Sequence, residues 1–166
     1  MILRCTKKVL AVIGPKLLAD PAPAPDPEDW YANLLWSGRR KCLLLTHSAT
    51  LFSIFEPNVS AADLRATDRL VTRLIKRELL SEGLPMATFT GPEPVNVILA
   101  RTADRSVLGC MNDMAFHCEV VIADSGGLAH TDLAELNQSL RRNINSARGY
   151  RPPIELTAKR PGAPVT

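Results

Sequence analysis

The sequence predicts a single α+β domain, in which an antiparallel or mixed β-sheet is covered by about three helices. Strand-like apolar runs cluster between Trp30 and Phe55, and helical periodicity dominates after Ser60. The sequence contains no repeating βα alternation and no internal repeat, which argues against a doubly wound nucleotide-binding fold. The chain has 166 residues, 46% of them hydrophobic, which suits one domain with its own core. We therefore expect one domain over residues 1–158 and a disordered tail at 159–166.

The N-terminal segment is predicted to form a short strand, a helix and an extended loop. Ile2–Cys5 reads as a strand, and Thr6 can cap a helix over Lys7–Ile13. Proline then stands at every second position from 21 to 27, which excludes a helix or a central strand. Residues 20–29 are therefore expected to be an exposed, extended, proline-rich loop.

A three-stranded antiparallel meander is predicted to follow. Its strands are Trp30–Trp36, Lys41–His47 and Thr50–Phe55. The continuous apolar run Cys42–Leu45 indicates that the middle strand is covered on both faces. A fourth strand near Val95 is expected over Val95–Ala100.

The clearest predicted helix runs from Ala61 to Ser81, with Ser60 as its cap. Apolar residues recur at helical spacing on one side of it. The opposite side carries five cations: Arg65, Arg69, Arg73, Lys76 and Arg77. Such a basic face suits an acidic protein surface or a phosphate backbone, or it is simply solvated. Aromatic residues for base stacking make up only 5% of the chain, so a protein partner is favoured over nucleic acid.

Two more helices and a final strand complete the expected fold. The second helix starts at Asp104 or Ser106 and reaches about Ala123, and Thr131 caps a third helix to about Asn145. A last strand is expected over Ile154–Ala158.

The second helix carries the best candidate for chemistry. Its polar cluster consists of Ser106, Gly109, Asn112 and Asp113, and Arg105 and His117 share the side away from the apolar stripe. Asp113 and His117 are four residues apart, the spacing at which a carboxylate can orient an imidazole as a general base or a metal ligand. In the alternative interpretation, Asn112 and Asp113 bind a neighbouring loop and Gly109 permits close packing.

A second candidate motif lies at the end of the meander. The segment from Ser48 to Phe52 ends in Leu51 and Phe52, and this apolar pair resembles the short peptides by which replication proteins dock into the bacterial DNA sliding clamp. Those peptides usually begin with Gln, where this chain has Ser48. A core strand is the alternative interpretation of the same residues.

Neither a metal nor a cofactor is expected. The chain has no Cys-x-x-Cys pair, and the sulfur row of Cys110, Met114 and Cys118 coincides with the core side of its helix. The four cysteines are expected to be reduced and mostly buried, which suits a cytoplasmic protein. No apolar run is long enough to cross a membrane.

Four blocks in order resemble a bacterial and archaeal domain family classed as being of unknown function. They are Leu3–Lys8, Trp30–Leu34, Arg40–Thr46 and Arg105–Asp113. The resemblance spans most of residues 1–155 and implies neither an activity nor catalytic residues, because none is assigned to the family. The proline-rich insert after Asp20 and the cysteine at 110 depart from the family pattern.

These observations favour a non-enzymatic partner-binding protein. It is expected to be the toxin or regulatory component of a small bacterial toxin–antitoxin-like module, acting on a protein partner such as an antitoxin, a regulator or a replication protein. The alternative is a nucleic-acid-binding protein or nuclease that uses the basic helix with Arg105, Asp113 and His117.

Overall fold

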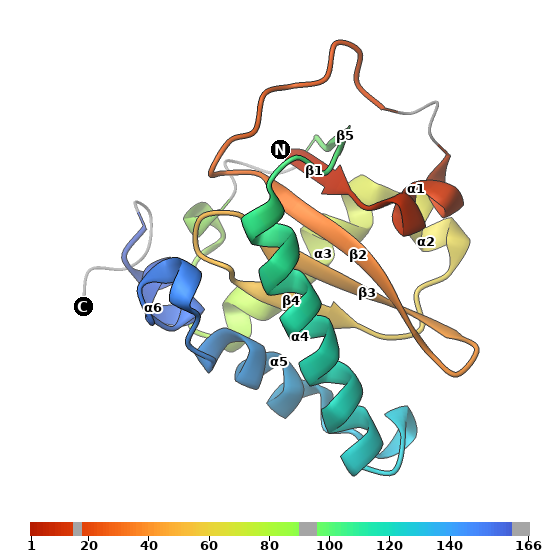
Figure 1. The fold of residues 1–166 in the computed structure, drawn as a ribbon, viewed down its shortest axis with the longest axis vertical. Coiled ribbons are helices and arrows are strands. Elements are labelled where there is room, and N and C mark those ends of the chain that lie inside the picture. The colour runs from red at the N-terminus through yellow and green to blue at the C-terminus, as the bar shows by residue number, and fades with distance from the viewer. Residues whose placement is uncertain (15–17, 90–95, 161–166) are drawn as a thin grey trace.

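The computed structural model describes residues 1–14, 18–89 and 96–160. A five-stranded mixed sheet with the order β4-β3-β2-β1-β5 forms its centre (Figure 1). The strands are β1 (Ile2–Cys5), β2 (Trp30–Ser37), β3 (Arg40–His47), β4 (Ser53–Glu56) and β5 (Ile98–Arg101). Strand β1 is parallel to both of its neighbours, β2 and β5, whereas β2, β3 and β4 form an antiparallel meander.

The predicted meander is confirmed, but its third strand begins later than expected. β2 and β3 pair along their whole length, and Gly38 supplies the positive φ of 59° that their tight turn needs. Leu51 also has a positive φ, of 59°, so the chain turns there and enters β4 only at Ser53. Strand β5 lies close to the predicted position, and Val95 itself is outside the described residues.

Within the described residues, six α-helices surround the sheet, rather than about three. They are α1 (Lys7–Ile13), α2 (Ala61–Arg65), α3 (Thr67–Ser81), α4 (Arg105–Asp124), α5 (Leu133–Arg142) and α6 (Pro153–Ala158). The long helix predicted from Ala61 to Ser81 is interrupted at Ala66, which gives α2 and α3. The strand expected at Ile154–Ala158 is wrong, because Pro153 starts a helix at the position where a helix tolerates proline best.

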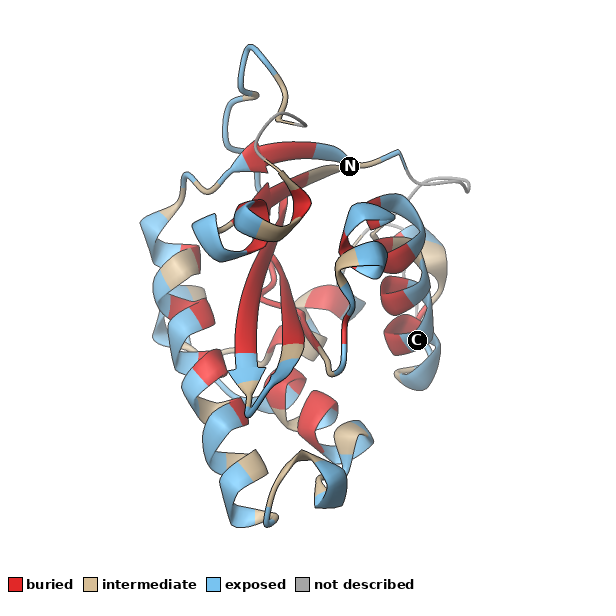
Figure 2. Cartoon of the chain, turned by 90° about the vertical axis from the view of Figure 1, so that its right-hand side faces the viewer, coloured by how far each residue is buried: buried red, intermediate tan, exposed pale blue. Residues whose placement is uncertain are grey.

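The helices bury both faces of the sheet. Residues of α1, α2 and α3 join one apolar core, and residues of α4 and α5 join a second core on the other face. Figure 2 shows α4 with its buried residues toward the sheet and its exposed residues on the outside. Burial of the two faces explains why the central strands read as continuous apolar runs.

The proline-rich loop is tied to the sheet by a buried arginine. Arg4 on β1 is 2% exposed, forms an ion pair with Asp29, and donates hydrogen bonds to the carbonyls of Pro23 and Ala24. The predicted loop is therefore extended, but it is held at both of its halves. Arg160 lies within the segment expected to be disordered, yet it pairs with Glu28 of the same loop, while residues 161–166 are outside the described part of the chain.

Candidate partner-binding surfaces

Leu51 and Phe52 are fully buried, so the structure contradicts their prediction as an exposed docking peptide. Both side chains are 0% exposed, and they enter different cores on opposite faces of the sheet. The chain turns at Leu51, where φ is 59°, and the side chain of Leu51 packs in the core beside α4 while that of Phe52 packs in the core beside α3. A pair arranged in this way cannot be inserted into a partner's pocket without unfolding the end of the meander.

The five cations of the basic face are all exposed, as predicted. Arg73 and Arg77 form ion pairs with Glu56 of the edge strand β4. Arg65 and Arg69 instead line a pocket of about 490 Å³ between the start of α3 and β5, and within the described residues neither has an ion-pair partner. Arg65 at the end of α2 and Arg69 in α3 therefore offer positive charge to a ligand at the junction of these two helices.

The predicted polar cluster lies on the outer side of α4. Ser106, Gly109, Asn112 and Asp113 are exposed, as is Arg105 at the start of the helix. Two parts of the alternative interpretation fail. A Cβ atom added to Gly109 would meet nothing within 4 Å, so close packing does not require glycine here. In the described structure, neither the Asn112 nor the Asp113 side chain hydrogen-bonds a neighbouring loop.

His117 is turned away from Asp113. Its Nε2 atom lies 2.8 Å from the Ser139 hydroxyl on α5, and the Ser139 hydroxyl donates to the carbonyl of Leu136. The predicted carboxylate–imidazole hydrogen bond is not formed, because position 117 faces α5 while position 113 faces solvent. Arg105, Asp113 and His117 are therefore on one helix without converging on one point.

The same outer side of α4 carries exposed apolar residues that the sequence interpretation missed. Phe116 is 67% exposed and Val120 is 39% exposed, and their spacing of four places them on one side of the helix. We define the α4 outer stripe as Asn112, Asp113, Phe116, Glu119, Val120 and Asp124. All six residues of the stripe are exposed.

The α4 outer stripe is acidic as well as apolar. It contains the carboxylates of Asp113, Glu119 and Asp124, none of which forms an ion pair or a side-chain hydrogen bond within the described structure. No lysine or arginine occurs between residues 106 and 140. Two features of the sequence therefore mark this surface. The stretch around the helix contains no cation, and the helix has apolar residues on more than one side.

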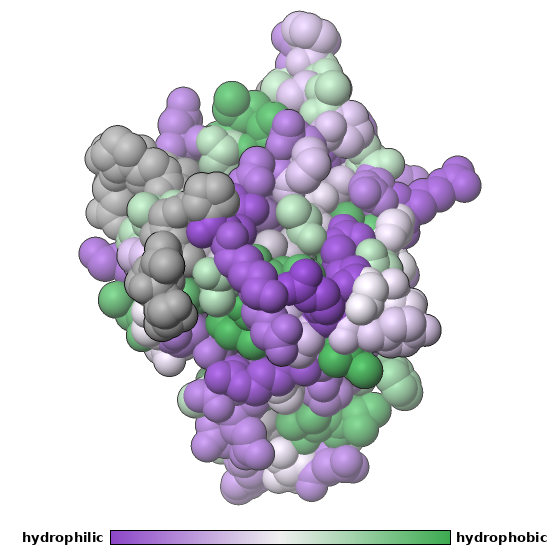
Figure 3. Space-filling view, turned by 90° about the vertical axis from the view of Figure 1, so that its left-hand side faces the viewer, coloured by the Kyte–Doolittle hydropathy of each residue, from purple (hydrophilic) through white to green (hydrophobic). Residues whose placement is uncertain are grey.

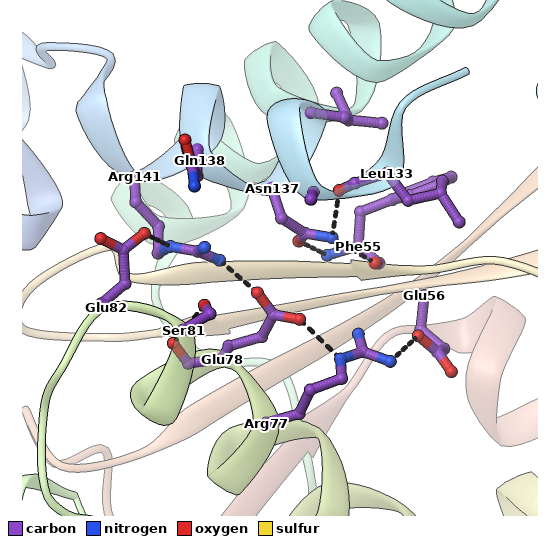
Figure 4. A network of polar contacts seen from close by, with 12 residues as sticks. Phe55, Glu56, Arg77, Glu78, Ser81, Glu82, Leu133, Asn137, Gln138 and Arg141 are labelled. Carbon is purple, nitrogen blue, oxygen red and sulfur yellow. Dashed lines mark hydrogen bonds and ion pairs between the residues drawn. The ribbon is translucent and has the colours of Figure 1, made fainter.

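A buried ion network joins α3 to α5 (Figure 4). Arg141 is 1% exposed and donates to Glu78 at 2.8 Å and to Glu82 at 2.7 Å. Burial alone would raise the pKa of Glu82, but hydrogen bonds from Arg142 and Arg141 hold that pKa below its ordinary value. Arg77 continues the network by bridging Glu78 to Glu56.

This network borders a pocket of about 250 Å³ whose charges are already matched. Each carboxylate lining the pocket, Glu56 and Glu78, is held by at least one arginine, and Asn137 at its edge is bound to the backbone of Phe55. Each of these groups already has a partner within the fold, and together they connect α3, α5 and β4. We therefore assign the network a structural role.

Nucleophilic and metal chemistry find no support in the described part of the chain. The four cysteines are free and buried, and burial raises the pKa of the Cys5 and Cys118 thiols to about 12, which makes them poor nucleophiles. No group of three potential metal ligands occurs among the described residues. None of the described helices is both long and apolar enough for a membrane span.

The face of the molecule that includes α6 carries many hydrophilic side chains. Figure 3 shows hydrophilic side chains gathered across the middle of this face, with a group of apolar side chains below them. Arg148 donates to the backbone carbonyls of Ser48 and Ala49, and Arg160 donates to that of Thr88. These arginines hold loops and the end of the chain in place.

Comparison with known proteins identifies a family whose function is unknown. The family described as a domain of unknown function, DUF6933, matches residues 2–156. No curated protein and no solved structure gives a significant match.

Proposed function

We propose that this chain, which belongs to the DUF6933 family of domains of unknown function, is a non-enzymatic protein that binds a protein partner on the α4 outer stripe. One observation carries the proposal. Phe116 and Val120 stand exposed on the same side of a 20-residue helix whose other side is buried in a core. Exposed apolar side chains that form a patch rimmed by polar residues are typical of interaction sites.

The stripe is well suited to recognition because its backbone is rigid. Val107, Met111 and Cys118 anchor α4 to the sheet, and Asp104 caps its first turn with hydrogen bonds to two backbone N–H groups. A partner would find the Phe116 ring already displayed, so little backbone ordering would oppose binding. Aromatic side chains are also the residues that dominate binding free energy at interfaces.

The test is a quantitative capture experiment with matched variants. The double variant Phe116→Ser/Val120→Ser removes the apolar part of the stripe, and Leu80→Ser removes a side chain that is 63% exposed on α3. Partner proteins recovered by the wild-type chain should be lost with the double variant and retained with Leu80→Ser. Circular dichroism and thermal unfolding establish that both variants are folded. Equal recovery by all three chains would contradict the proposal.

A cytoplasmic location and a role as toxin or regulator belong to the same proposal. Four free, buried cysteines support a reducing compartment. The toxin role stays a prediction from the sequence, and its test is growth inhibition on expression of the chain. Loss of inhibition in the Phe116→Ser/Val120→Ser variant would connect that effect to the stripe. If that variant inhibited growth as strongly as the wild-type chain, growth inhibition would not depend on the α4 outer stripe.

A second candidate function is the binding of nucleic acid at the start of α3. The observation that favours it is the exposed pair Arg65 and Arg69 beside a pocket of about 490 Å³. Binding of this kind should weaken steeply with salt, and Arg65→Ala/Arg69→Ala should reduce it. Lys7→Ala/Lys8→Ala is the matched control because it removes the same charge from α1. If filter binding at low salt detects no DNA or RNA, this candidate is excluded.

A further inference from the structure

We infer that the partner of the α4 outer stripe is a basic amphipathic segment, with apolar side chains for Phe116 and Val120 and flanking lysines or arginines for Asp113 and Asp124. This inference rests on the proposed function and specifies the chemistry of the partner. Three observations support it: the distribution of charge along the chain, the lack of ion-pair partners for the stripe's carboxylates among the described residues, and the shape of the surface.

The charge of the chain is strongly segregated. Residues 106–140 contain five of the 17 acidic residues and no lysine or arginine, which leaves 12 acidic against 20 basic residues elsewhere. The segment is thus negative within a chain whose net charge is +3. Such segregation attracts a partner of opposite charge and speeds its encounter with the surface.

The carboxylates of the stripe are available for new contacts. Glu56, Glu78 and Glu82 on other elements are all bound by arginines. Asp113 and Asp124, in contrast, have no such contact among the described residues, and both lie on the flank of Phe116 and Val120. A neutral apolar partner would cover these carboxylates without compensating their lost hydration, whereas a lysine or arginine would replace it.

The shape of the surface indicates which flank the cations occupy. On the other flank, Trp36 is 47% exposed and shares a pocket of about 140 Å³ with Glu119. Lys8 lies over the Trp36 ring, with its Nζ atom 5.9 Å from the ring centroid. Because this flank already has a cation, we place apolar contacts of the partner against Trp36 and its cations against Asp113 and Asp124.

A second copy of the chain fits less well than a different basic protein. Two α4 outer stripes brought together would oppose their own carboxylates, which costs free energy. In a second copy, Arg73 and Arg77 are already bound to Glu56, so Arg65 and Arg69 are the cations of its basic face that could meet the stripe. Self-association would appear as a concentration-dependent mass in analytical ultracentrifugation, and it would overturn the inference if Asp113→Asn/Asp124→Asn abolished it.

The probe is a designed, fluorescently labelled 18-residue amphipathic helix with leucines on one face and lysines along one flank of that face. Two control peptides carry glutamates in place of the lysines, or serines in place of the leucines. Anisotropy titrations use the full chain and two charge variants. Asp113→Asn/Asp124→Asn neutralises the stripe, and Asp20→Asn/Glu155→Gln removes the same charge at exposed positions elsewhere.

We expect the lysine–leucine peptide to bind the wild-type chain and both control peptides to fail. Its affinity should fall roughly fivefold at low salt in the Asp113→Asn/Asp124→Asn variant and remain unchanged in the Asp20→Asn/Glu155→Gln variant. Absence of binding, or equal affinity for the two charge variants, overturns the inference. The proposed function fails separately, through the capture experiment with Phe116→Ser/Val120→Ser, so the two failures are distinguishable.

Discussion

The side-chain amide of Asn137 pairs with the backbone of Phe55 as a neighbouring β-strand would. The Phe55 N–H donates to Oδ1 of Asn137 at 2.7 Å, and Nδ2 of Asn137 donates to the Phe55 carbonyl at 3.0 Å. Strand β4 is the last strand on its side of the sheet, so these two bonds occupy backbone groups at an open edge. Helix α5 thereby protects an edge that could otherwise pair with another chain.

Replacing Asn137 with Ala should destabilise the protein by about 1–3 kcal/mol, because the buried N–H of Phe55 loses its acceptor. The free energy of unfolding in urea measures this change. Gln138→Ala is the control, since Gln138 is the exposed neighbour on the same helix. Equal stability of the two variants would show that the amide pairing contributes nothing. If Asn137→Ala aggregates more as its concentration rises and Gln138→Ala does not, this would support the conclusion that Asn137 protects the edge of β4.

The buried ion network predicts a second loss of stability. Removing Arg141 by substitution with Met leaves Glu78 and Glu82 buried without the cation between them, and we expect a cost of about 3 kcal/mol. Arg142→Met removes a half-exposed partner of Glu82 and should cost less than 1 kcal/mol.

A double variant separates charge from packing in this network. Arg141 also lies over the Phe52 ring, 5.2 Å from its centroid, so its loss removes an apolar contact as well. Adding Glu78→Gln to Arg141→Met should recover part of the lost stability, because it removes one uncompensated charge. If the double variant is less stable than Arg141→Met alone, the loss comes from packing instead.

The stability of the fold should depend on pH through His47. Burial lowers the pKa of His47 from 6.5 to about 3, and the nearby charges of Arg160 and Arg148 act in the same direction. Glu28 lies 3.8 Å from its Nε2 atom, but that carboxylate is exposed and bound by Arg160, so burial dominates. Between pH 6.5 and 3 the unfolded chain binds more protons than the folded chain. Stability therefore falls as the pH drops through this range, by up to about 1.4 kcal/mol per unit.

Urea unfolding at pH 7, 6 and 5 tests the dependence on His47. The His47→Gln variant should lose much of the slope between pH 6 and 5, whatever its stability at pH 7. His130→Gln is the control because His130 is exposed. A slope in His47→Gln identical to that of the wild-type chain would assign the pH dependence to other groups.

Local patterns predicted the parts of the fold that depend on local physics. The strands β2 and β3 follow from continuous apolar runs around a glycine turn, and Asp104 was recognisable as a helix cap. The helix α6 was missed because Pro152 and Pro153 read as the start of an extended segment. A proline at the first helical turn is equally compatible with a helix, and only packing decides between the two.

The candidate site was harder to predict because exposure is a tertiary property. Val120, Val121 and Ile122 are equally apolar in sequence, yet Val120 is exposed while its neighbours are partly covered. Leu51 and Phe52 looked like a displayed pair because the sequence does not reveal the turn at Leu51. His117 could be placed four residues from Asp113, but its hydrogen bond to Ser139 depends on the position of α5.

Gly109 provides a final prediction, which separates space from backbone conformation. Gly109 lies inside α4 with helical geometry, and a Cβ atom there would meet nothing within 4 Å. Gly109→Ala should therefore stabilise the protein by about 0.5–1 kcal/mol, through the higher helix propensity of alanine. Gly38 offers the same free space, but its φ of 59° is unfavourable for alanine, so Gly38→Ala should destabilise. Thermal and urea unfolding of the two variants measure the contrast. If Gly109→Ala destabilised the protein, the free space described for a Cβ atom at this position would be wrong. If the variant kept its stability but captured less partner, Gly109 would belong to the binding surface.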